Sequence, residues 1–370
     1  MKIKKLHLFK IKIPLKNPVM HHLGSYRFSE SIIVKVTTDK GIIGWGEARP
    51  RPYLTGETLE SVRTTIADLC AKHLSGKVFA NFEDVRKYLQ QSIQVAKNML
   101  SAYCGIELSI LDAAGKEFRR NITDIIGHVQ NPIVTEAANI GFQIKTNELR
   151  KVCLAIKFGG YRAAKIKVGC KDDLERIRFI REFFGDRFFL WVDANGAWDF
   201  ETAFQKINQI KKYGITVYEQ PLAAIEMSNM ARLRSQTKVK LIADESLCTM
   251  DDALALIKEN ACDIFNIRIG KCGGIQKSID LINLANNNRI KFYLGSLVAE
   301  TGILLQPLKL FVKGIKGVSI VEGLRQNNTL LEDDIVAGDA PYGLGIKISD
   351  KKLTKYSDNS FVCKIGVNLE

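Results

Sequence analysis

Short β-branched segments alternate with helix-like segments from about residue 134 to residue 321, and polar residues recur near the segment ends. Five of these residues follow one another at intervals of 26, 26, 25 and 24 positions: Lys167, Asp193, Glu219, Asp244 and Arg268. Strands followed by helices at one period predict a parallel sheet with right-handed crossovers. The predicted strands are 136–141, 164–168, 188–193, 216–219, 239–244, 263–269, 291–295 and 318–321. Eight such units in roughly 200 residues favour a closed barrel; an open doubly wound sheet offers no reason for the polar residues to recur in phase.

The first part of the chain has a different pattern. Its predicted strands are 31–37 and 41–46, and its predicted helices are 57–74, 81–89 and 98–116. The expected fold is α/β, a modified (β/α)8 TIM-like barrel over residues 126–325 with an N-terminal α+β capping domain over residues 1–125. Strand-like pieces after residue 326 predict that the segment 326–370 packs back on the capping domain and completes it.

The chain of 370 residues has a formal net charge of +14, with its lysines scattered along the whole length. We interpret this charge as a solvated surface that favours anionic substrates by steering. A nucleic-acid-binding or non-catalytic barrel is the alternative, but no basic helix or aromatic platform accompanies the charge, so no nucleic-acid partner is expected. The eight cysteines show no CxxC pair or zinc spacing, and no apolar run is long enough to cross a bilayer. These features predict a cytoplasmic protein without membrane contact.

Three carboxylates stand near the C-terminal ends of successive predicted strands: Asp193 in WVDAN, Glu219 in YEQP and Asp244 in ADES. In a barrel these ends meet on one face, where active sites lie. Three unpaired carboxylates would repel one another, and Mg²⁺ is a cation that prefers oxygen ligands. The pattern predicts one Mg²⁺ per subunit, held by these three residues. The alternative, three separate capping or ion-pairing residues, does not explain their common phase.

Lys165 and Lys167 lie two residues apart on the strand before Asp193 and therefore share one face of it. Two ammonium groups in one barrel mouth are expected to depress each other's pKa, which makes Lys167 the predicted general base. Lys165, one pleat deeper, is predicted to bind the substrate carboxylate and to stabilise enolate charge. The alternative is that both lysines face the outer helices and are solvated.

Several motifs resemble the enolase superfamily and, within it, the muconate-lactonizing enzyme subgroup. They are KIKVG (165–169), VDAN (192–195), EQP (219–221), ADES (243–246) and GGI (273–275), with GWGEA (44–48), TGET (55–58) and LDAAGK (111–116) in the N-terminal part. The chain looks most like the dipeptide epimerases of that subgroup. The resemblance implies Mg²⁺-dependent removal of a proton next to a carboxylate, epimerisation of a substrate such as an L-Ala-D/L-Glu dipeptide, and cap loops at 21–27 and 49–56 that cover the mouth.

Two positions depart from that resemblance. The resemblance places a second base lysine at the end of the sixth strand, where we place Arg268, and arginine is not deprotonated in proteins. Lys271 lies three residues further on, which is out of phase on a continuing strand, so its entry from the loop is the less favoured alternative. A one-base cycloisomerase or dehydratase, with Arg268 as an electrostatic partner, therefore remains open. The expected Asp-x-Asp pair after the last strand is reduced to Glu322, a single carboxylate for a substrate ammonium group.

The remaining candidates are residues near strand ends or cap loops that we expect to contact a small carboxylate substrate, for example a dipeptide. They are Arg27, Asn139, Asn195, Lys271, Ser296 and Glu322. We also expect a homo-oligomer.

Overall fold

The computed structural model describes residues 1–21, 24–92, 94–128, 134–142, 146–325, 330–331 and 342–364. Eight parallel strands form a closed barrel in the order β10-β11-β4-β5-β6-β7-β8-β9. They are β4 (Thr135–Ile140), β5 (Ala163–Lys167), β6 (Phe189–Asp193), β7 (Val217–Glu219), β8 (Lys240–Ala243), β9 (Ile264–Ile267), β10 (Lys291–Gly295) and β11 (Ile320–Glu322). The predicted barrel and all eight of its strands are confirmed, with bounds that shift by up to two residues.

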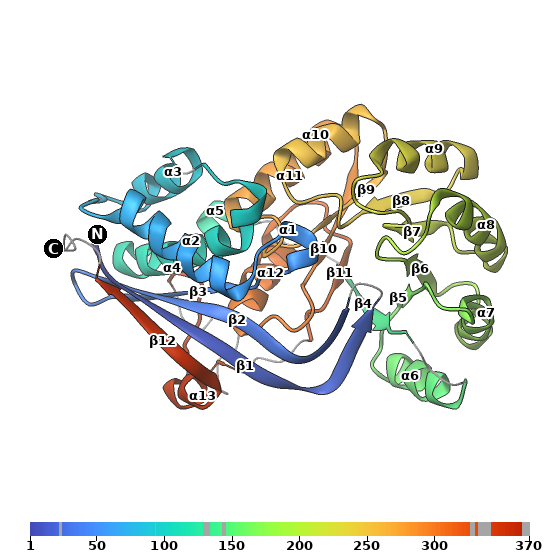
Figure 1. The fold of residues 1–370 in the computed structure, drawn as a ribbon, viewed down its shortest axis with the longest axis horizontal. Helices are drawn as coiled ribbons and strands as arrows, with labels where there is room; N and C mark the ends of the chain where they lie inside the picture. Colours follow the sequence, from blue (N-terminus) through green and yellow to red (C-terminus); the bar gives the residue numbers. More distant parts are fainter. Residues whose placement is uncertain are drawn as a thin grey trace.

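Helices cover the outside of the barrel, one after each of the first seven strands (Figure 1). They are α6 (Thr146–Phe158), α7 (Asp173–Phe184), α8 (Phe200–Ile210), α9 (Met227–Thr237), α10 (Met250–Lys258), α11 (Ile275–Asn287) and α12 (Gly302–Gly314), with the short 3₁₀ turn η2 (Lys211–Tyr213). Side-chain oxygens of Asp199 and Thr249 accept hydrogen bonds from the first turns of α8 and α10. Such capping residues begin a helix because the first backbone N–H groups have no partner within it.

A four-stranded antiparallel sheet lies beside the barrel, in the order β12-β1-β2-β3. Its strands are β1 (Ile3–His21), β2 (Gly24–Thr38), β3 (Ile43–Ala48) and β12 (Ser357–Lys364). The helices that accompany it are α1 (Pro52–Thr55), α2 (Leu59–Leu74), α3 (Phe82–Ser92), η1 (Lys97–Met99), α4 (Leu100–Phe118), α5 (Thr123–Ile126) and α13 (Asp350–Tyr356). We call this sheet and these helices the cap.

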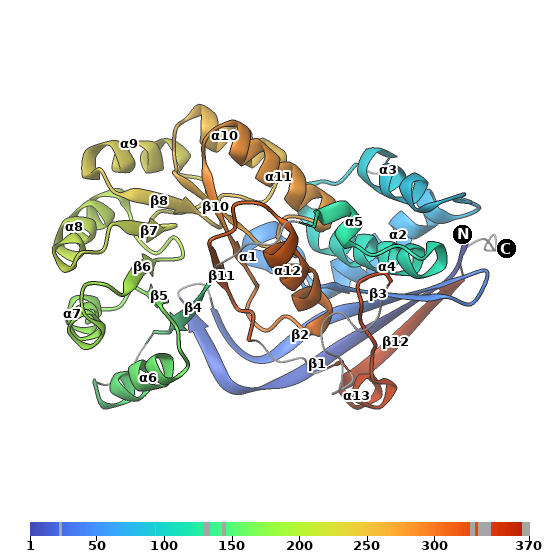
Figure 2. The same ribbon diagram turned by 180° about the vertical axis from the view of Figure 1, so that it is seen from behind.

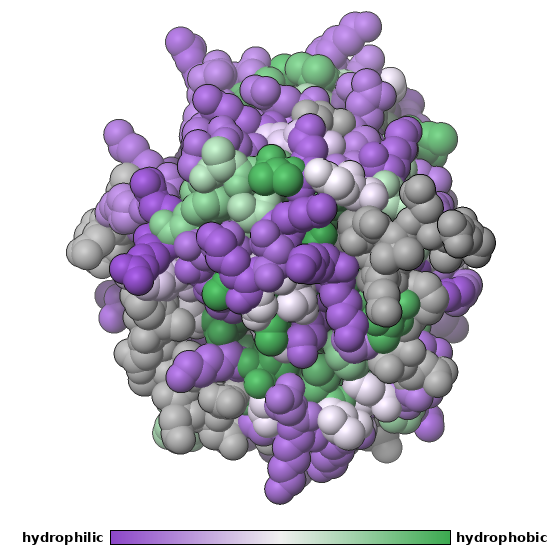
Figure 3. All heavy atoms as spheres, turned by 90° about the vertical axis from the view of Figure 1, so that its left-hand side faces the viewer, coloured by the Kyte–Doolittle hydropathy of each residue, from purple (hydrophilic) through white to green (hydrophobic). Residues whose placement is uncertain are grey.

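The C-terminal part of the chain returns to the cap, as expected, because β12 pairs with β1 (Figure 2). Residues 343–348, one of the strand-like pieces after residue 326, do not form a strand; they contribute two isolated bridges, of Gly343 with Asn121 and of Ile348 with Leu331. The first residues of the chain and Lys364, the last described residue, therefore lie close together at the cap end of the molecule. That end, seen in Figure 3, carries mostly hydrophilic side chains with apolar ones between them, in keeping with the solvated surface expected from the scattered lysines.

Helix α4 is the core of the cap and is buried from Leu100 to Gly115. It packs backbone to backbone on β3, because a Cβ atom at Gly46 would lie 2.0 Å from the carbonyl oxygen of Gly105. Glycine on the strand therefore sets the distance between the two elements. None of the helices within the described residues has the length and apolar content that crossing a bilayer requires.

The cap is joined to the barrel through the segment that follows β10. The carboxylate of Glu47, at the end of β3, accepts hydrogen bonds from the backbone and hydroxyl of Thr301. The guanidinium groups of Arg49 and Arg51 donate to the carbonyl of Val298, at 3.0 and 2.6 Å. These buried contacts tie residues 47–51, which lead into α1, to the segment just after the C-terminal end of β10.

Candidate active site

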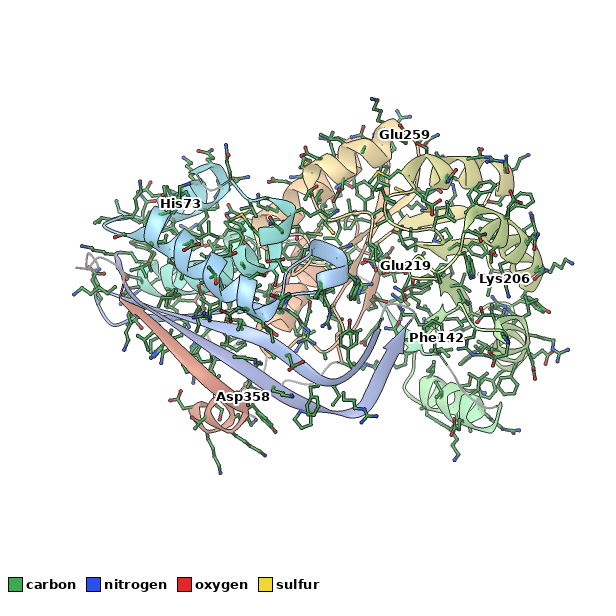
Figure 4. The ribbon with its side chains drawn as sticks, viewed as in Figure 1. His73, Phe142, Lys206, Glu219, Glu259 and Asp358 are labelled. Carbon is green, nitrogen blue, oxygen red and sulfur yellow. The ribbon has the colours of Figure 1, made fainter. Side chains whose placement is uncertain are left out.

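The three predicted metal ligands come together inside the barrel mouth. One oxygen from each of Asp193, Glu219 and Asp244 lies within 4.8 Å of the other two, and all three side chains are buried. The pairing of β5 with β6 and of β6 with β7 places Lys167, Asp193 and Glu219 at one level. In Figure 4, Glu219 lies within the ring of strands, whereas Lys206 and Glu259 lie on the outer helices.

The electrostatics of this cluster fit a hard divalent cation. Burial, followed by the nearby carboxylate of Asp193, raises the pKa of Glu219 to about 7. Burial and then the charge of Asp244 raise the pKa of Glu245 to about 8. A cation among the carboxylates would offset both the desolvation and the mutual repulsion, and oxygen donors are the ligands that Mg²⁺ takes. The three carboxylates present therefore suit Mg²⁺.

Glu219 is held by side chains that the sequence did not single out. Its Oε2 atom accepts hydrogen bonds from Trp191 Nε1 at 3.0 Å and from Tyr293 Oη at 2.8 Å. Its Oε1 atom accepts one from Asn266 Nδ2 at 2.9 Å. Trp191 lies two residues before Asp193 on β6 and therefore shares its face, so alternation along the strand could have predicted that Trp191 enters the site.

Lys167 and Lys165 both point into the barrel, as predicted. Lys167 Nζ lies 2.6 Å from Asp193 Oδ2 and donates to Asn195 Oδ1, also at 2.6 Å. Lys165 lies one pleat deeper and is buried, with Nζ 2.7 Å from Glu322 Oε2 and 3.3 Å from Glu219 Oε1. The expectation of a depressed lysine pKa is wrong for Lys165. Burial alone would lower its pKa, but the carboxylates of Glu219, Glu322 and Asp193 outweigh burial and raise it.

Lys271 enters the site, contrary to the phase argument made from the sequence. Its Nζ lies 2.8 Å from Asp244 Oδ1 and also donates to the carbonyl of Asp244. The predicted strand 263–269 in fact ends at Ile267, and a turn follows it. Side chains alternate between the two faces only while the backbone stays extended. Lys271 lies in the turn, so its distance of three residues from Arg268 does not direct its side chain out of the barrel.

Arg268 lies at the centre of the site, where it contacts three carboxylates. Its guanidinium contacts Asp244 at 2.7 Å, Glu322 at 3.1 Å and Glu219 at 3.4 Å, and it donates to the carbonyl of Ser296 at 2.9 Å. Burial would lower its pKa, but Asp244 and Glu322 outweigh burial and raise it, so the group stays charged. It acts as a fixed positive charge among the carboxylates.

Lys167 and Lys271 stand on opposite sides of the carboxylates. In the closed eight-strand order, β5 and β9 are four positions apart in either direction, so they face each other across the barrel. Lys167, at the end of β5, contacts Asp193. Lys271, in the turn after β9, contacts Asp244. Lys167 is partly exposed, whereas Lys271 is buried and its Nζ donates to Asp244 Oδ1 and to the carbonyls of Asp244 and Asn266. Lys271 therefore has to release one of these partners to reach a group bound between the two carboxylates.

The weaker candidates fall into two groups. Asn195 is buried and joins Lys167 to Glu245, to which its Nδ2 donates at 2.8 Å. Glu322 is buried against Lys165 and Arg268. By contrast, Asn139 and Arg27 are exposed. Of the predicted cap loop 21–27, residues 22 and 23 lie outside the described residues, as do the side chains of residues 21, 24 and 25.

A barrel whose mouth holds three buried carboxylates between two lysines, under an α+β cap, defines an enolase-type enzyme. Comparison with known families agrees with that class. Residues 148–351 match the "Enolase C-terminal domain-like" family, and residues 4–127 match the N-terminal domain family of mandelate racemase and muconate lactonizing enzyme. The chain belongs to the enolase superfamily and to its muconate-lactonizing subgroup, which confirms the predicted kinship and the predicted isomerase class.

Two relatives show where the similarity is strong. The N-succinyl-L-Arg/Lys racemase of Bacillus cereus is 32% identical over 307 residues, 81% of each chain. Its crystal structure superposes with a TM-score of 0.88, at 28% identity over 98% of this chain and 100% of that one. The hydrophobic dipeptide epimerase of Enterococcus faecalis is 28% identical over 97% of this chain and 98% of its own. A crystal structure of an Enterococcus faecalis dipeptide epimerase with Mg and the dipeptide L-Leu-L-Tyr gives a TM-score of 0.81, at 27% identity over 94% and 100% of the chains.

Proposed function

We propose that this protein is a Mg²⁺-dependent racemase or epimerase that inverts the α-carbon of N-acylated amino acids by a two-base proton transfer. The observation that carries the proposal is the placement of Lys167 and Lys271 on opposite sides of the carboxylate cluster, at 2.6 Å from Asp193 and 2.8 Å from Asp244. Inversion requires removal of a proton from one face of the α-carbon and delivery of a proton to the other. A single base cannot reach both faces.

In the proposed reaction the neutral amine of one lysine takes the α-proton, which breaks the C–H bond and forms an N–H bond. The ammonium group of the other lysine then returns a proton to the opposite face. Lys167 is the base for one enantiomer and Lys271 for the other, so the two lysines exchange the roles of proton acceptor and proton donor when the reaction runs in reverse. Lys165 and Arg268 place fixed positive charge where negative charge develops on the substrate.

We propose that Asp193, Glu219 and Asp244 hold one Mg²⁺ per subunit. When bound, the ion supplies positive charge that stabilises the deprotonated substrate. Asn195 keeps Lys167 directed at Asp193 through its 2.6 Å hydrogen bond.

The substrate class follows from the relatives and from Glu322. A dipeptide and an N-succinyl amino acid share an amide nitrogen on a carbon that carries a carboxylate. Glu322 was expected to bind the ammonium group of a dipeptide, yet it already pairs with Lys165 at 2.7 Å and Arg268 at 3.1 Å. A second ammonium group there would meet a carboxylate that two cations have neutralised. We therefore propose that acyl groups without an ammonium group, such as succinyl, are preferred over aminoacyl groups.

The test is α-proton exchange in D₂O with Mg²⁺, measured separately on the L and D forms of N-succinyl amino acids and of dipeptides. The wild-type protein is expected to exchange both forms of one substrate. Lys167→Met is expected to stop exchange from one enantiomer, and Lys271→Met from the other. Lys240→Met, at an exposed position at the start of β8, is the matched control and is expected to leave both exchanges unchanged.

Two results would overturn the proposal. One is an absence of exchange by the wild-type protein on every substrate of the panel. The other is exchange of a single enantiomer by the wild-type protein, lost in Lys167→Met and kept in Lys271→Met. That second result would favour the one-base alternative, a cycloisomerase or dehydratase; a chloromuconate cycloisomerase of Cupriavidus necator is 26% identical over 81% of this chain and 82% of its own.

A further inference from the structure

The direction in which Lys271 points depends on the turn between β9 and α11, residues 268–274. The backbone of this turn closes on itself, with Cys272 N donating to the carbonyl of Arg268 at 2.8 Å and Gly274 N to that of Ile269 at 2.9 Å. Lys271 Nζ donates in turn to the carbonyl of Asn266, the third residue of β9. The turn therefore positions the backbone of Lys271, and its amine is then held by Asp244 and by the carbonyl of Asn266.

The far end of the turn is held by a carboxylate from the cap. Glu107, on α4, is fully buried and accepts hydrogen bonds from the backbone of Ile275 at 2.5 Å and of Gln276 at 3.1 Å. These are N–H groups of the first turn of α11, which have no partner within the helix. A negative charge is also stabilised at a helix N-terminus.

The contact between Glu107 and the turn is tight. A Cβ atom at Gly274 would lie 2.0 Å from Glu107 Oε2, and the φ angle of Gly274 is +102°, so glycine alone fits without strain or displacement. Gly274 lies three residues after Lys271 along the chain. A shift of the carboxylate would therefore move the segment that carries the amine.

From this geometry we propose that Glu107 is a positioning residue for Lys271, through which the cap fixes one of the two bases of the barrel. The inference rests on the proposed two-base reaction. It assigns Glu107 an effect on one half of that reaction only, because Lys167 lies on β5, at the opposite side of the barrel, and none of its hydrogen-bond or ion-pair partners among the described residues belongs to the turn.

The experiment compares proton exchange from the two enantiomers in Glu107→Gln, with the substrate that the wild-type protein exchanges in the panel above. Lys271→Met first identifies the enantiomer that Lys271 serves. Exchange from that enantiomer is expected to fall by about 10²-fold, the effect of a misplacement of about 1 Å, while exchange from the other changes by less than about threefold. Glu107→Asp, which keeps the charge, is expected to show a smaller loss on the same enantiomer.

Glu57→Gln is the matched control. Glu57 is another buried carboxylate at a helix N-terminus, where it accepts from the backbone of Ser101 at 2.8 Å and of Ala102 at 2.9 Å at the start of α4. This substitution is expected to affect both enantiomers equally. If Glu107→Gln does not fold, Glu107→Asp and Gly274→Ala test the same contact from its two sides.

The outcomes separate the two proposals. If the wild-type protein does not exchange both enantiomers, the two-base reaction fails and takes this inference with it. A different result refutes the positioning role alone. In that result the wild-type protein exchanges both enantiomers and Lys271→Met stops exchange from one of them, but the Glu107 variants lower exchange from both enantiomers equally. A purely structural role for Glu107 predicts that second pattern.

Discussion

Tyr293→Phe is expected to weaken Mg²⁺ binding without disturbing the barrel. The substitution removes the hydroxyl that donates to Glu219 Oε2 at 2.8 Å. It keeps the ring, which packs edge to face against Trp191 with centroids 6.0 Å apart. A hydrogen bond to a charged group contributes about 1.5–3 kcal/mol, and loss of a group that orients a metal ligand typically costs 10- to 100-fold in affinity. We therefore expect the Kd for Mg²⁺ to rise by about 10- to 100-fold, or roughly 1.4–2.7 kcal/mol.

The effect should also depend on pH. The pKa of Glu219 is raised to about 7, so protons compete with the metal for this carboxylate near neutrality. A lost donor raises that pKa further, because the hydroxyl stabilises the charged form. The difference in affinity between Tyr293→Phe and the wild-type protein is therefore expected to be larger at pH 6.5 than at pH 8.5.

Isothermal titration calorimetry with Mg²⁺ measures both effects. The matched control is Tyr218→Phe, since the hydroxyl of Tyr218 is also buried but donates to the backbone carbonyls of Ile215 and Ile207, outside the site. That variant should bind Mg²⁺ as the wild-type protein does. Equal Mg²⁺ affinity in the wild-type protein and Tyr293→Phe, at both pH values, would refute the view that this hydroxyl holds the metal ligand in place.

Three further predictions follow from the buried charges. Mg²⁺ at about 100 times its Kd should raise the free energy of unfolding by about 2.7 kcal/mol, and EDTA should reverse this in a thermal or urea unfolding assay; an unchanged transition would argue against a metal site. Glu322→Gln leaves Lys165 and Arg268 with less counter-charge and should lower the free energy of unfolding by about 3–5 kcal/mol, whereas a change below about 1 kcal/mol would show that the ion pairs contribute little. Burial raises the pKa of Glu107 from 4.5 to about 7 despite its backbone hydrogen bonds. Between these two pH values the folded protein keeps a proton on Glu107 that the unfolded chain has released. The free energy of unfolding should therefore fall as the pH rises from about 4.5 to about 7. At 1.36 kcal/mol per pKa unit, the fall in the free energy of unfolding is on the order of 3 kcal/mol. In Glu107→Gln the fall should be smaller by about this amount. The same dependence of the free energy of unfolding on pH in the two proteins would contradict the prediction.

Much of the fold and part of the site follow from the sequence alone. The repeat of 24–26 residues predicted the barrel, since a polar residue at each strand end recurs at one period only if each unit contributes a strand and a helix. The same repeat predicted that Asp193, Glu219 and Asp244 lie close together, because the C-terminal ends of the barrel strands share one face. Alternation along a strand placed Lys165 and Lys167 on one face, and their contacts with Asp193 and Glu322 show that this face is the inner one.

The tertiary structure decided what lies beyond the regular strands. Alternation predicts a side chain's direction only while the backbone stays extended, and β9 ends at Ile267, so the entry of Lys271 depended on a turn whose shape a distant carboxylate, Glu107, helps to hold. The partners of a buried charge are likewise set by residues far apart in sequence. Lys165 keeps a raised pKa and Glu322 is neutralised because carboxylates and cations from several strands meet in one small volume with little water to screen them.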